Sequence, residues 1–309
     1  MQTIIGSGGA IGIELAKALK QYTEHIRLVS RNPEKVNKTD ELFTADVLNP
    51  DELSKAVKNS EVVYVTVGFP YNYKIWREKW PKFIKNLLSI CEKEGCKLVF
   101  FDNIYMYDKD SLNPATENSP INPPSKKGEI RANIARMIME KAEKGSVKAL
   151  IARSADFYGP SIENTSLLTE TVFKPISEGK TANWLMNDTV KHSFTFTPDA
   201  GKATALLGNT EKAYGQIWHL PTASNPYTGR EWVEAIAKAM GTKPKYRVVS
   251  KFMIRLIGLF VPVMKESVEM LYQYEGDYVF DSSKFQKEFN SLPTPYDEGI
   301  KQIINSDYL

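Results

Sequence analysis

The chain has little cysteine and little histidine. Its two cysteines, Cys91 and Cys96, have a C-x4-C spacing that fits neither a zinc site nor a redox C-x-x-C pair. We therefore expect reduced, half-buried core residues. The histidines, His25, His192 and His219, are widely separated and predict no metal site. His192 or His219 could face a substrate or make a structural hydrogen bond.

The chain also lacks a dominant charge and a long hydrophobic run. Its 309 residues include 40 Lys and Arg and 37 Asp and Glu, a net charge of +3. We therefore expect no nucleic-acid and no membrane partner. The longest apolar run, residues 252–264, contains Arg255 and is too short to cross a bilayer. A first strand that begins at residue 2 leaves no room for a leader peptide, so we expect a cytoplasmic protein.

What the sequence does contain is a glycine-rich turn near its start. Residues 1–5 predict a strand, and the apolar stripe from Ile11 to Leu19 predicts an amphipathic helix. The glycines between them are spaced G-x-x-G-x-x-G, one residue different from the common G-x-G-x-x-G dinucleotide fingerprint. A flexible turn without a ligand explains poorly the last glycine, which costs about 1 kcal/mol inside a helix. We predict that the turn binds a pyrophosphate through Gly6, Ser7, Gly8, Gly9, Ala10, Ile11 and Gly12.

The residues after the next two strands indicate which dinucleotide is bound. Arg31 follows the predicted strand 26–30, at the place where an acid would accept from the ribose 2′-OH of NAD. An arginine there suits the 2′-phosphate, so we predict NADP, with NAD as the alternative. A solvated arginine at a strand end is the structural alternative. Asp46, after the predicted strand 41–45, could accept from an adenine amino group or cap the loop backbone.

Polar groups also follow the later strands, at 62–67, 97–101 and 147–153. In open α/β sheets, ligands bind outside the carboxyl ends of the strands. We therefore predict that the cofactor also contacts Val67, Gly68, Asp102 and Tyr158. On the helix before the last of these strands, Lys127 and Arg131 are four residues apart and share a face distinct from the apolar stripe.

Strands and helices alternate to about residue 160 and are less regular beyond it. This order predicts an α/β fold, a doubly wound parallel sheet with a smaller, mostly helical C-terminal substrate region. We expect residues 1–160, with about 190–220, to bind the cofactor. Residues 161–189 and 221–309 would then bind the substrate.

With the glycine turn, Arg31, Asp46, Tyr158-Gly159-Pro160 and Thr197-Pro198-Asp199-Ala200 in order, the sequence resembles the extended short-chain dehydrogenase/reductases. Within them it resembles the NAD-dependent epimerase/dehydratase group, over nearly the whole chain. The resemblance implies a Rossmann domain with a substrate region.

It also implies a helical Tyr-x-x-x-Lys pair, in which the Tyr handles the substrate's proton and the Lys lowers its pKa. Here Lys127 stands at the Tyr position and Arg131 at the Lys position. The one Tyr-x-x-x-Lys, at Tyr105, lies in a predicted loop.

Three functional hypotheses follow. In the first, an NADP-dependent oxidoreductase acts on a small carbonyl or enone substrate. Tyr105 donates a proton, Lys127 or Arg131 stabilises the phenolate, and Asn103 orients the substrate. In the second, the chain binds NADP(H) without redox chemistry and resembles the NmrA-like regulators. In the third, it is a nucleotide-sugar epimerase or dehydratase. The resemblance also implies a homodimer through the helices after strands four and five, and the apolar stripe of residues 83–91 permits one.

Overall fold

The computed structural model describes residues 1–162 and 165–309 of the chain, which falls into two compact units. Unit 1 contains Met1–Ile104, Lys127–Ser154 and Pro198–Leu220. Unit 2 contains Tyr105–Lys126, Ala155–Thr197 and Pro221–Leu309. The domain boundaries expected from the sequence stay a prediction, and each unit is described by itself below.

Unit 1 is built on a seven-stranded parallel sheet with the order β10-β6-β5-β4-β1-β2-β3. In the centre of the sheet, Gln2 of β1 aligns with Ile26 on one side and Val62 on the other. The β4 strand is buried along its whole length, as required of a strand covered on both faces. The strands are β1 (Gln2–Ile5), β2 (Ile26–Ser30), β3 (Glu41–Thr44), β4 (Val62–Val65), β5 (Lys97–Asp102), β6 (Ala149–Arg153) and β10 (Ile217–His219).

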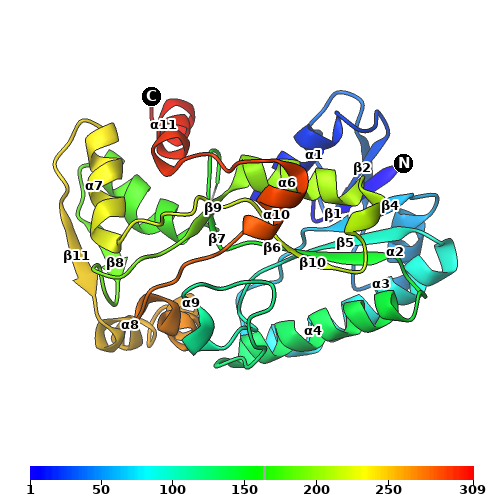
Figure 1. The fold of residues 1–309 in the computed structure, drawn as a ribbon, viewed down its shortest axis with the longest axis horizontal. Helices are drawn as coiled ribbons and strands as arrows, with labels where there is room; N and C mark the ends of the chain where they lie inside the picture. Colours follow the sequence, from blue (N-terminus) through cyan, green and yellow to red (C-terminus); the bar gives the residue numbers. More distant parts are fainter. Residues whose placement is uncertain (163–164) are drawn as a thin grey trace. The chain divides into compact units, whose positions relative to one another are not determined.

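Helices cover both faces of this sheet, with α1 and α6 on one face and α3 and α4 on the other (Figure 1). Their bounds are α1 (Ala10–Leu19), α2 (Pro50–Val57), α3 (Tyr73–Glu94), α4 (Lys126–Glu143) and α6 (Thr197–Gly208). Local chemistry sets their ends: the Asn49 side chain caps α2, and α3 stops at Gly95, whose φ is 67°. The predicted doubly wound parallel sheet is confirmed.

Unit 2 combines short helices with two small parallel sheets, β7-β9 and β8-β11. Its strands are β7 (Asp156–Tyr158), β8 (Ala182–Leu185), β9 (Phe194–Phe196) and β11 (Tyr246–Val249). Its α-helices are α5 (Lys174–Ser177), α7 (Gly229–Ala239), α8 (Lys251–Ile257), α9 (Pro262–Ser267), α10 (Ser283–Phe289) and α11 (Tyr296–Asp307). A π-helical turn spans Thr169–Phe173 and a 3-10 segment spans Val268–Tyr274. The predicted helical character is therefore accompanied by β8 and β11, which the sequence did not indicate.

The core of unit 2 is aromatic. Tyr158, Phe194, Trp232 and Tyr296 are buried and contact one another with ring centroids 4.6 to 6.5 Å apart. The Trp232 ring N–H donates to the carbonyl of His192, at 3.0 Å. These large buried rings thus hold together segments that are far apart in the sequence.

One expectation about burial was wrong. Cys91 and Cys96 are free thiols, as expected, but they are fully buried rather than half-buried. Lys127 and Arg131, predicted to share a face of α4 apart from the apolar stripe, are buried as well. Long basic side chains can be accommodated in a core when partners neutralise or cover the charged group.

Candidate functional site

The glycine turn of unit 1 follows β1 directly and leads into α1. Gly6 has a φ of 96°, and a Cβ on it would lie 2.5 Å from the backbone nitrogen of Val67. A Cβ on Gly12 would lie 2.7 Å from the carbonyl oxygen of Gly6. These two positions need glycine because the protein backbone itself approaches them closely.

Gly8 and Gly9 differ, because no neighbour among residues 1–162 and 165–309 requires glycine at either position. A Cβ on Gly9 would come no nearer than 3.8 Å to the Gly6 carbonyl, and a Cβ on Gly8 would have no neighbour within 4 Å. Both residues are exposed at the start of α1, whose first-turn N–H groups have no partner inside the helix. The open glycines therefore leave these N–H groups accessible to an anion.

Two buried hydroxyls lie at this edge of the sheet without a hydrogen-bond partner in the described part of the chain, Ser7 Oγ in the turn and Ser30 Oγ at the end of β2. An unpaired buried hydroxyl is costly unless a ligand satisfies it. Arg31 follows Ser30 and is exposed. The accessible helix start, the hydroxyls and the cation together fit the phosphates of a dinucleotide.

Three other predicted cofactor contacts of unit 1 follow the carboxyl ends of strands: Asp46 after β3, and Val67 and Gly68 after β4. Val67 is half-buried against Gly6, and Gly68 is exposed with open space around it. Asp46 is exposed, and its Oδ1 accepts from the Leu48 N–H at 3.0 Å, so it does cap its own loop. An adenine contact by its other oxygen stays a prediction.

At the end of β5, Asp102 belongs to a buried ion cluster. Its Oδ1 accepts two hydrogen bonds from Arg131, one of them 2.8 Å long, and its Oδ2 lies 3.5 Å from Arg153 Nε. The Arg131 guanidinium also lies 4.6 Å from the centroid of the Trp80 ring. The predicted roles of Asp102 at the cofactor and of Arg131 at a phenolate stay predictions.

The remaining predicted catalytic residues are distributed over both units. Lys127 is fully buried in unit 1, with Nζ 4.6 Å from the centroid of the Tyr71 ring. Asn103 is half-buried, also in unit 1, and its N–H donates to Asp102 at 2.9 Å. Tyr105, half-buried, begins the first segment of unit 2. Tyr158 has no exposed surface, because its ring is in the aromatic core, and its predicted cofactor contact stays a prediction.

Unit 2 contains a second polar group, which we call the Asp156 cluster: Asp156, His192, Tyr274 and Tyr278. The Asp156 Oδ2 accepts from His192 Nε2 at 3.0 Å and from the Tyr274 hydroxyl at 3.1 Å. The His192 ring stacks on Tyr274, with centroids 4.1 Å apart, and meets the edge of Tyr278. Because Nε2 donates to a carboxylate, the neutral ring has an acceptor at Nδ1.

The cluster retains unused hydrogen-bonding capacity. His192 Nδ1 and the Tyr278 hydroxyl are buried and have no partner among residues 1–162 and 165–309. Burial, with the Asp156 charge as the next cause, raises the pKa of Tyr274 and Tyr278 well above the ordinary value. Tyr105 also contributes to both shifts, so it lies within electrostatic range of the cluster. The cluster therefore places two phenols that hold their protons tightly beside a carboxyl group and an imidazole ring.

Sequence reasoning found the glycine turn but not the Asp156 cluster. Its members come from β7, from the residue two before β9 and from the segment that follows α9. The available signals were the polar strand end that precedes Tyr158 and the unusual spacing of Tyr272, Tyr274 and Tyr278. Neither signal indicates that these segments meet.

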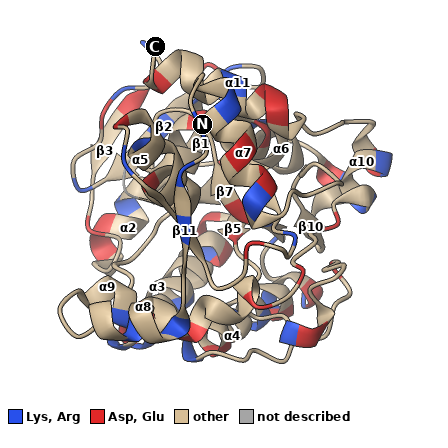
Figure 2. Cartoon of the chain, turned by 90° about the vertical axis from the view of Figure 1, so that its left-hand side faces the viewer, with Lys and Arg blue, Asp and Glu red and all other residues tan. Residues whose placement is uncertain are grey.

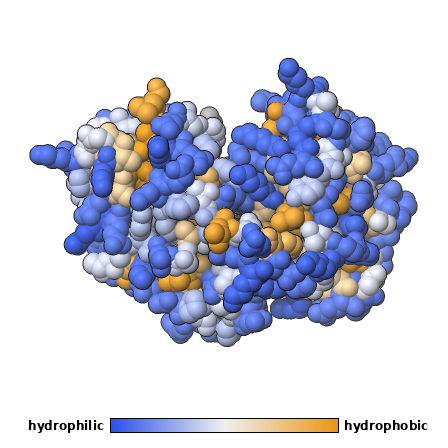
Figure 3. Space-filling view, turned by 45° about the horizontal axis from the view of Figure 1, so that its top comes forward, coloured by the Kyte–Doolittle hydropathy of each residue, from blue (hydrophilic) through white to orange (hydrophobic). Residues whose placement is uncertain are grey.

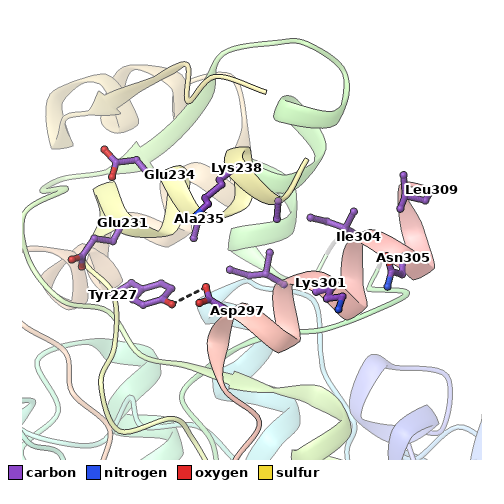
Figure 4. A pocket seen from close by; sticks show the side chains of 12 residues that line it. Tyr227, Glu231, Glu234, Ala235, Lys238, Asp297, Lys301, Ile304, Asn305 and Leu309 are labelled. Atoms are coloured by element: carbon purple, nitrogen blue, oxygen red, sulfur yellow. Dashed lines mark hydrogen bonds between the residues drawn. The ribbon is translucent and has the colours of Figure 1, made fainter. Parts of the chain in front are cut away.

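A groove of unit 2 lies elsewhere, between α7 and α11 (Figure 4). It has a volume of about 720 Å³, and within it the Tyr227 hydroxyl donates to Asp297 at 2.9 Å. Burial, together with this hydrogen bond, raises the pKa of Tyr227 to about 12. None of the residues predicted to be catalytic or cofactor-binding is among the described residues that line the groove.

Two absences concern only the part of the chain that the structure describes. No group of His, Cys, Asp and Glu side chains in this part is arranged to hold a metal ion. No helix in it has both the length and the apolar character needed to cross a bilayer.

Comparisons with known proteins agree with this geometry. The family model described as "NAD dependent epimerase/dehydratase family" matches residues 3–219. No curated protein sequence matches the chain significantly.

Solved structures match over nearly the whole chain. A double mutant of the dTDP-glucose 4,6-dehydratase DesIV from Streptomyces venezuelae, with NAD bound, has a TM-score of 0.81 at 14% identity. That match covers 99% of this chain and 96% of the other. The UDP-glucose 4-epimerase of Thermus thermophilus, also with NAD, has a TM-score of 0.79 at 16% identity, with 99% and 98% covered. At such identities the likeness establishes the fold.

Proposed function

The chain belongs to the NAD-dependent epimerase/dehydratase family, and we propose that it binds a nicotinamide dinucleotide and oxidises or reduces a hydroxyl or carbonyl carbon of a small polar substrate. The observation that carries this proposal is the glycine turn. Gly8 and Gly9 leave the start of α1 accessible, although no contact within the described residues requires glycine at these two positions. Nucleotide sugars are the first substrate class to test, because the similar structures are named as enzymes that act on dTDP-glucose and UDP-glucose. Small ketones and enones are the second class.

In this proposal the glycine turn and two nearby side chains, Ser7 and Arg31, bind the cofactor. The first N–H groups of α1 bind the diphosphate, and the Ser7 hydroxyl donates to a phosphate oxygen. Arg31 pairs with the 2′-phosphate, which favours NADP over NAD. When bound, the nicotinamide ring supplies the position that accepts or donates a hydride.

The residues of unit 2 bind the substrate and move its proton. Asp156 and the Nδ1 atom of His192 accept hydrogen bonds, and the Tyr278 hydroxyl can donate one. This set of neighbouring donors and acceptors suits a substrate with several hydroxyl groups better than it suits an apolar enone. Tyr105 transfers the proton to or from the reacting oxygen.

The cofactor proposal is tested by calorimetry with NAD⁺, NADH, NADP⁺ and NADPH. Wild type is expected to bind at least one of them, and Gly9→Val is expected to bind about tenfold or more weakly, since the branched side chain would block a diphosphate. Gly276→Val is the matched control, because Gly276 is also exposed, with no atom within 4 Å of its Cβ position and no positive φ. If no dinucleotide binds wild type, the proposed function is wrong.

The preference for NADP is tested separately with Arg31→Glu. Replacing the cation with an acid should weaken NADPH binding and favour NADH, because the carboxylate repels a 2′-phosphate and accepts from a 2′-hydroxyl. An unchanged ratio of the two dissociation constants would show that Arg31 is only a solvated surface residue.

The chemical step is tested with a panel of nucleotide sugars, ketones and enones, with the oxidation state of the cofactor followed by absorbance and the sugar products identified by NMR. Tyr105→Phe is expected to lower turnover about 100-fold or more while cofactor affinity is retained. Turnover that does not change in this variant would remove Tyr105 from the mechanism.

A second candidate function is an NADP(H)-binding regulator without catalysis. The observation that favours it is the buried ion cluster, in which Arg131 is engaged by Asp102 instead of being available as the cation of a Tyr/Lys pair. Tight dinucleotide binding, combined with no turnover of any substrate in the panel, would support the regulator over the enzyme.

A further inference from the structure

Residues 243–265 of unit 2 form an exposed apolar and basic surface, which we call the α8–α9 surface. Phe252 and Leu259 are each 74% exposed and Phe260 is 83% exposed, and Leu256 and Val263 are exposed as well. Single exposed apolar residues are normal, but a group of large ones in one short segment marks an interaction site. The face of the molecule in Figure 3, by contrast, is mostly hydrophilic, with separate hydrophobic patches.

The folded unit holds this surface in place. Ile254 on α8 is fully buried in the core of unit 2, so the opposite side of the helix must face outward. The Ser250 side chain caps α8 by accepting from the Met253 N–H. A Cβ on Gly258 would lie 2.9 Å from the backbone nitrogen of Lys265, so α8 and α9 are in close contact there. The exposed tip at residues 259–261 therefore joins two helices that pack closely against each other.

The charge of this segment is mainly basic. Residues 243–265 contain no Asp or Glu, and their basic residues are Lys243, Lys245, Arg247, Lys251, Arg255 and Lys265. The next residue of α9, Glu266, is acidic and half-buried. Figure 2 shows the Lys and Arg positions of β11, α8 and α9. Lys251 is paired with Glu275 at 3.0 Å, and Arg247 Nε donates to Asn183. Lys243, Lys245, Arg255 and Lys265 are exposed.

We propose that the α8–α9 surface docks the protein on an anionic lipid bilayer. The aromatic and aliphatic side chains at the tip enter the interfacial layer, and the surrounding cations contact the acidic head groups. The helices are too short to span a bilayer, so the association is peripheral and reversible. The net charge of +3 for the whole chain conceals this local excess, which is why composition alone predicted no membrane partner.

Charge favours a bilayer over a second copy of the chain. A symmetric dimer through this surface would bring the same cations face to face, and like charges across an interface oppose association. An acidic bilayer supplies both the negative charge and the apolar layer that the exposed tip requires.

The test is co-sedimentation of the full chain with two kinds of vesicle, phosphatidylcholine alone and phosphatidylcholine with 30% phosphatidylserine (about one lipid in three). We expect binding to the anionic vesicles, weakened by salt. The double variant Leu259→Ser/Phe260→Ser should bind about tenfold or more weakly. Leu292→Ser is the matched control, because Leu292 is an exposed apolar residue of unit 2 outside this surface. Arg255→Gln and Lys265→Gln, which alter exposed cations of α8 and α9 themselves, should each weaken binding about fivefold.

Three results would overturn the proposal: no binding to anionic vesicles, equal binding to both kinds of vesicle, or an unchanged affinity in the double variant. Light scattering in the absence of lipid provides a further check. A dimer that the double variant dissociates would mean that the surface joins two copies instead. All variants alter exposed side chains, and thermal melting shows whether each one retains the fold.

Discussion

The two units present carboxylates in opposite surroundings. Asp102, in unit 1, is completely buried between Arg131 and Arg153. Asp156, in unit 2, is about a quarter exposed, and its partners include an imidazole and a phenol. A carboxylate that is fully buried between two guanidinium groups is held in place by its counter-ions, whereas one with an exposed edge can still contact a ligand. The comparison therefore separates a structural ion cluster from a candidate substrate site.

The largest expected effect tests the structural half of this comparison. Asp102→Ala would leave Arg131 and Arg153 buried without their counter-ion, which should lower the free energy of unfolding by about 3–5 kcal/mol. Urea denaturation measures this change. Asp110→Ala, in an exposed pair with Lys109, is the control and should unfold as wild type does. If Asp102→Ala were nearly as stable as wild type, the ion cluster would not be structural and the comparison would fail.

The next largest effect tests whether Asp156 belongs to a substrate site. Asp156→Asn keeps the shape of the side chain and its ability to accept hydrogen bonds, but removes the charge. If Asp156 positions the substrate, turnover should fall about 100-fold, with a change in KM, while stability changes little. Steady-state kinetics on the best substrate of the panel, with denaturation of the same variant, measures both. A variant that lost stability but kept its turnover would place Asp156 with Asp102 as a structural residue.

A third effect is a dependence of stability on alkaline pH. Burial, with the Asp156 charge next, raises the pKa of Tyr274, so the folded state holds this proton more tightly than the unfolded chain does. The stabilisation is therefore complete below about pH 10, the ordinary pKa, and is lost as the pH rises above it. Tyr274→Phe should show a shallower decline, by up to about 1.4 kcal/mol per pH unit. Denaturation at pH values from 9 to 11 (about one unit on either side of the ordinary pKa) measures it, and equal slopes would contradict it.

The contrast between the units also explains how much the sequence revealed. In unit 1, a strand such as Val62–Val65 is a short apolar run, and α1 has its buried residues at helical spacing, so local patterns predicted the elements correctly. In unit 2, β8 and β11 were missed because each is a short strand that, in the described part of the chain, pairs with the other alone. Ala182 aligns with Tyr246, and nothing local to either strand indicates this pairing.

The same reasoning applies to the candidate site. The glycine turn could be predicted because all its residues lie in one segment, and the spacing of glycines follows from the close backbone approach at Gly6 and Gly12. The burial of Lys127 and Arg131 could not be predicted from helical spacing. It depends on partners such as Tyr71 and Asp102, which come from other elements. Likewise, the Asp156 cluster exists only once tertiary structure brings its segments together.

The smallest expected effect concerns a local motif of unit 2. It tests whether the capping box of α7 helps to fix the start of that helix. The Thr228 side chain accepts from the Glu231 N–H, and the Glu231 carboxylate accepts in return from the Thr228 N–H, which forms a capping box at the start of α7. Thr228→Ala should lower the free energy of unfolding by about 1 kcal/mol, and Thr228→Ser should restore most of it. Urea denaturation measures both variants. If Thr228→Ala and Thr228→Ser had the same free energy of unfolding, the capping box would not determine where this helix begins. Tertiary packing, through residues such as Trp232, would determine it alone.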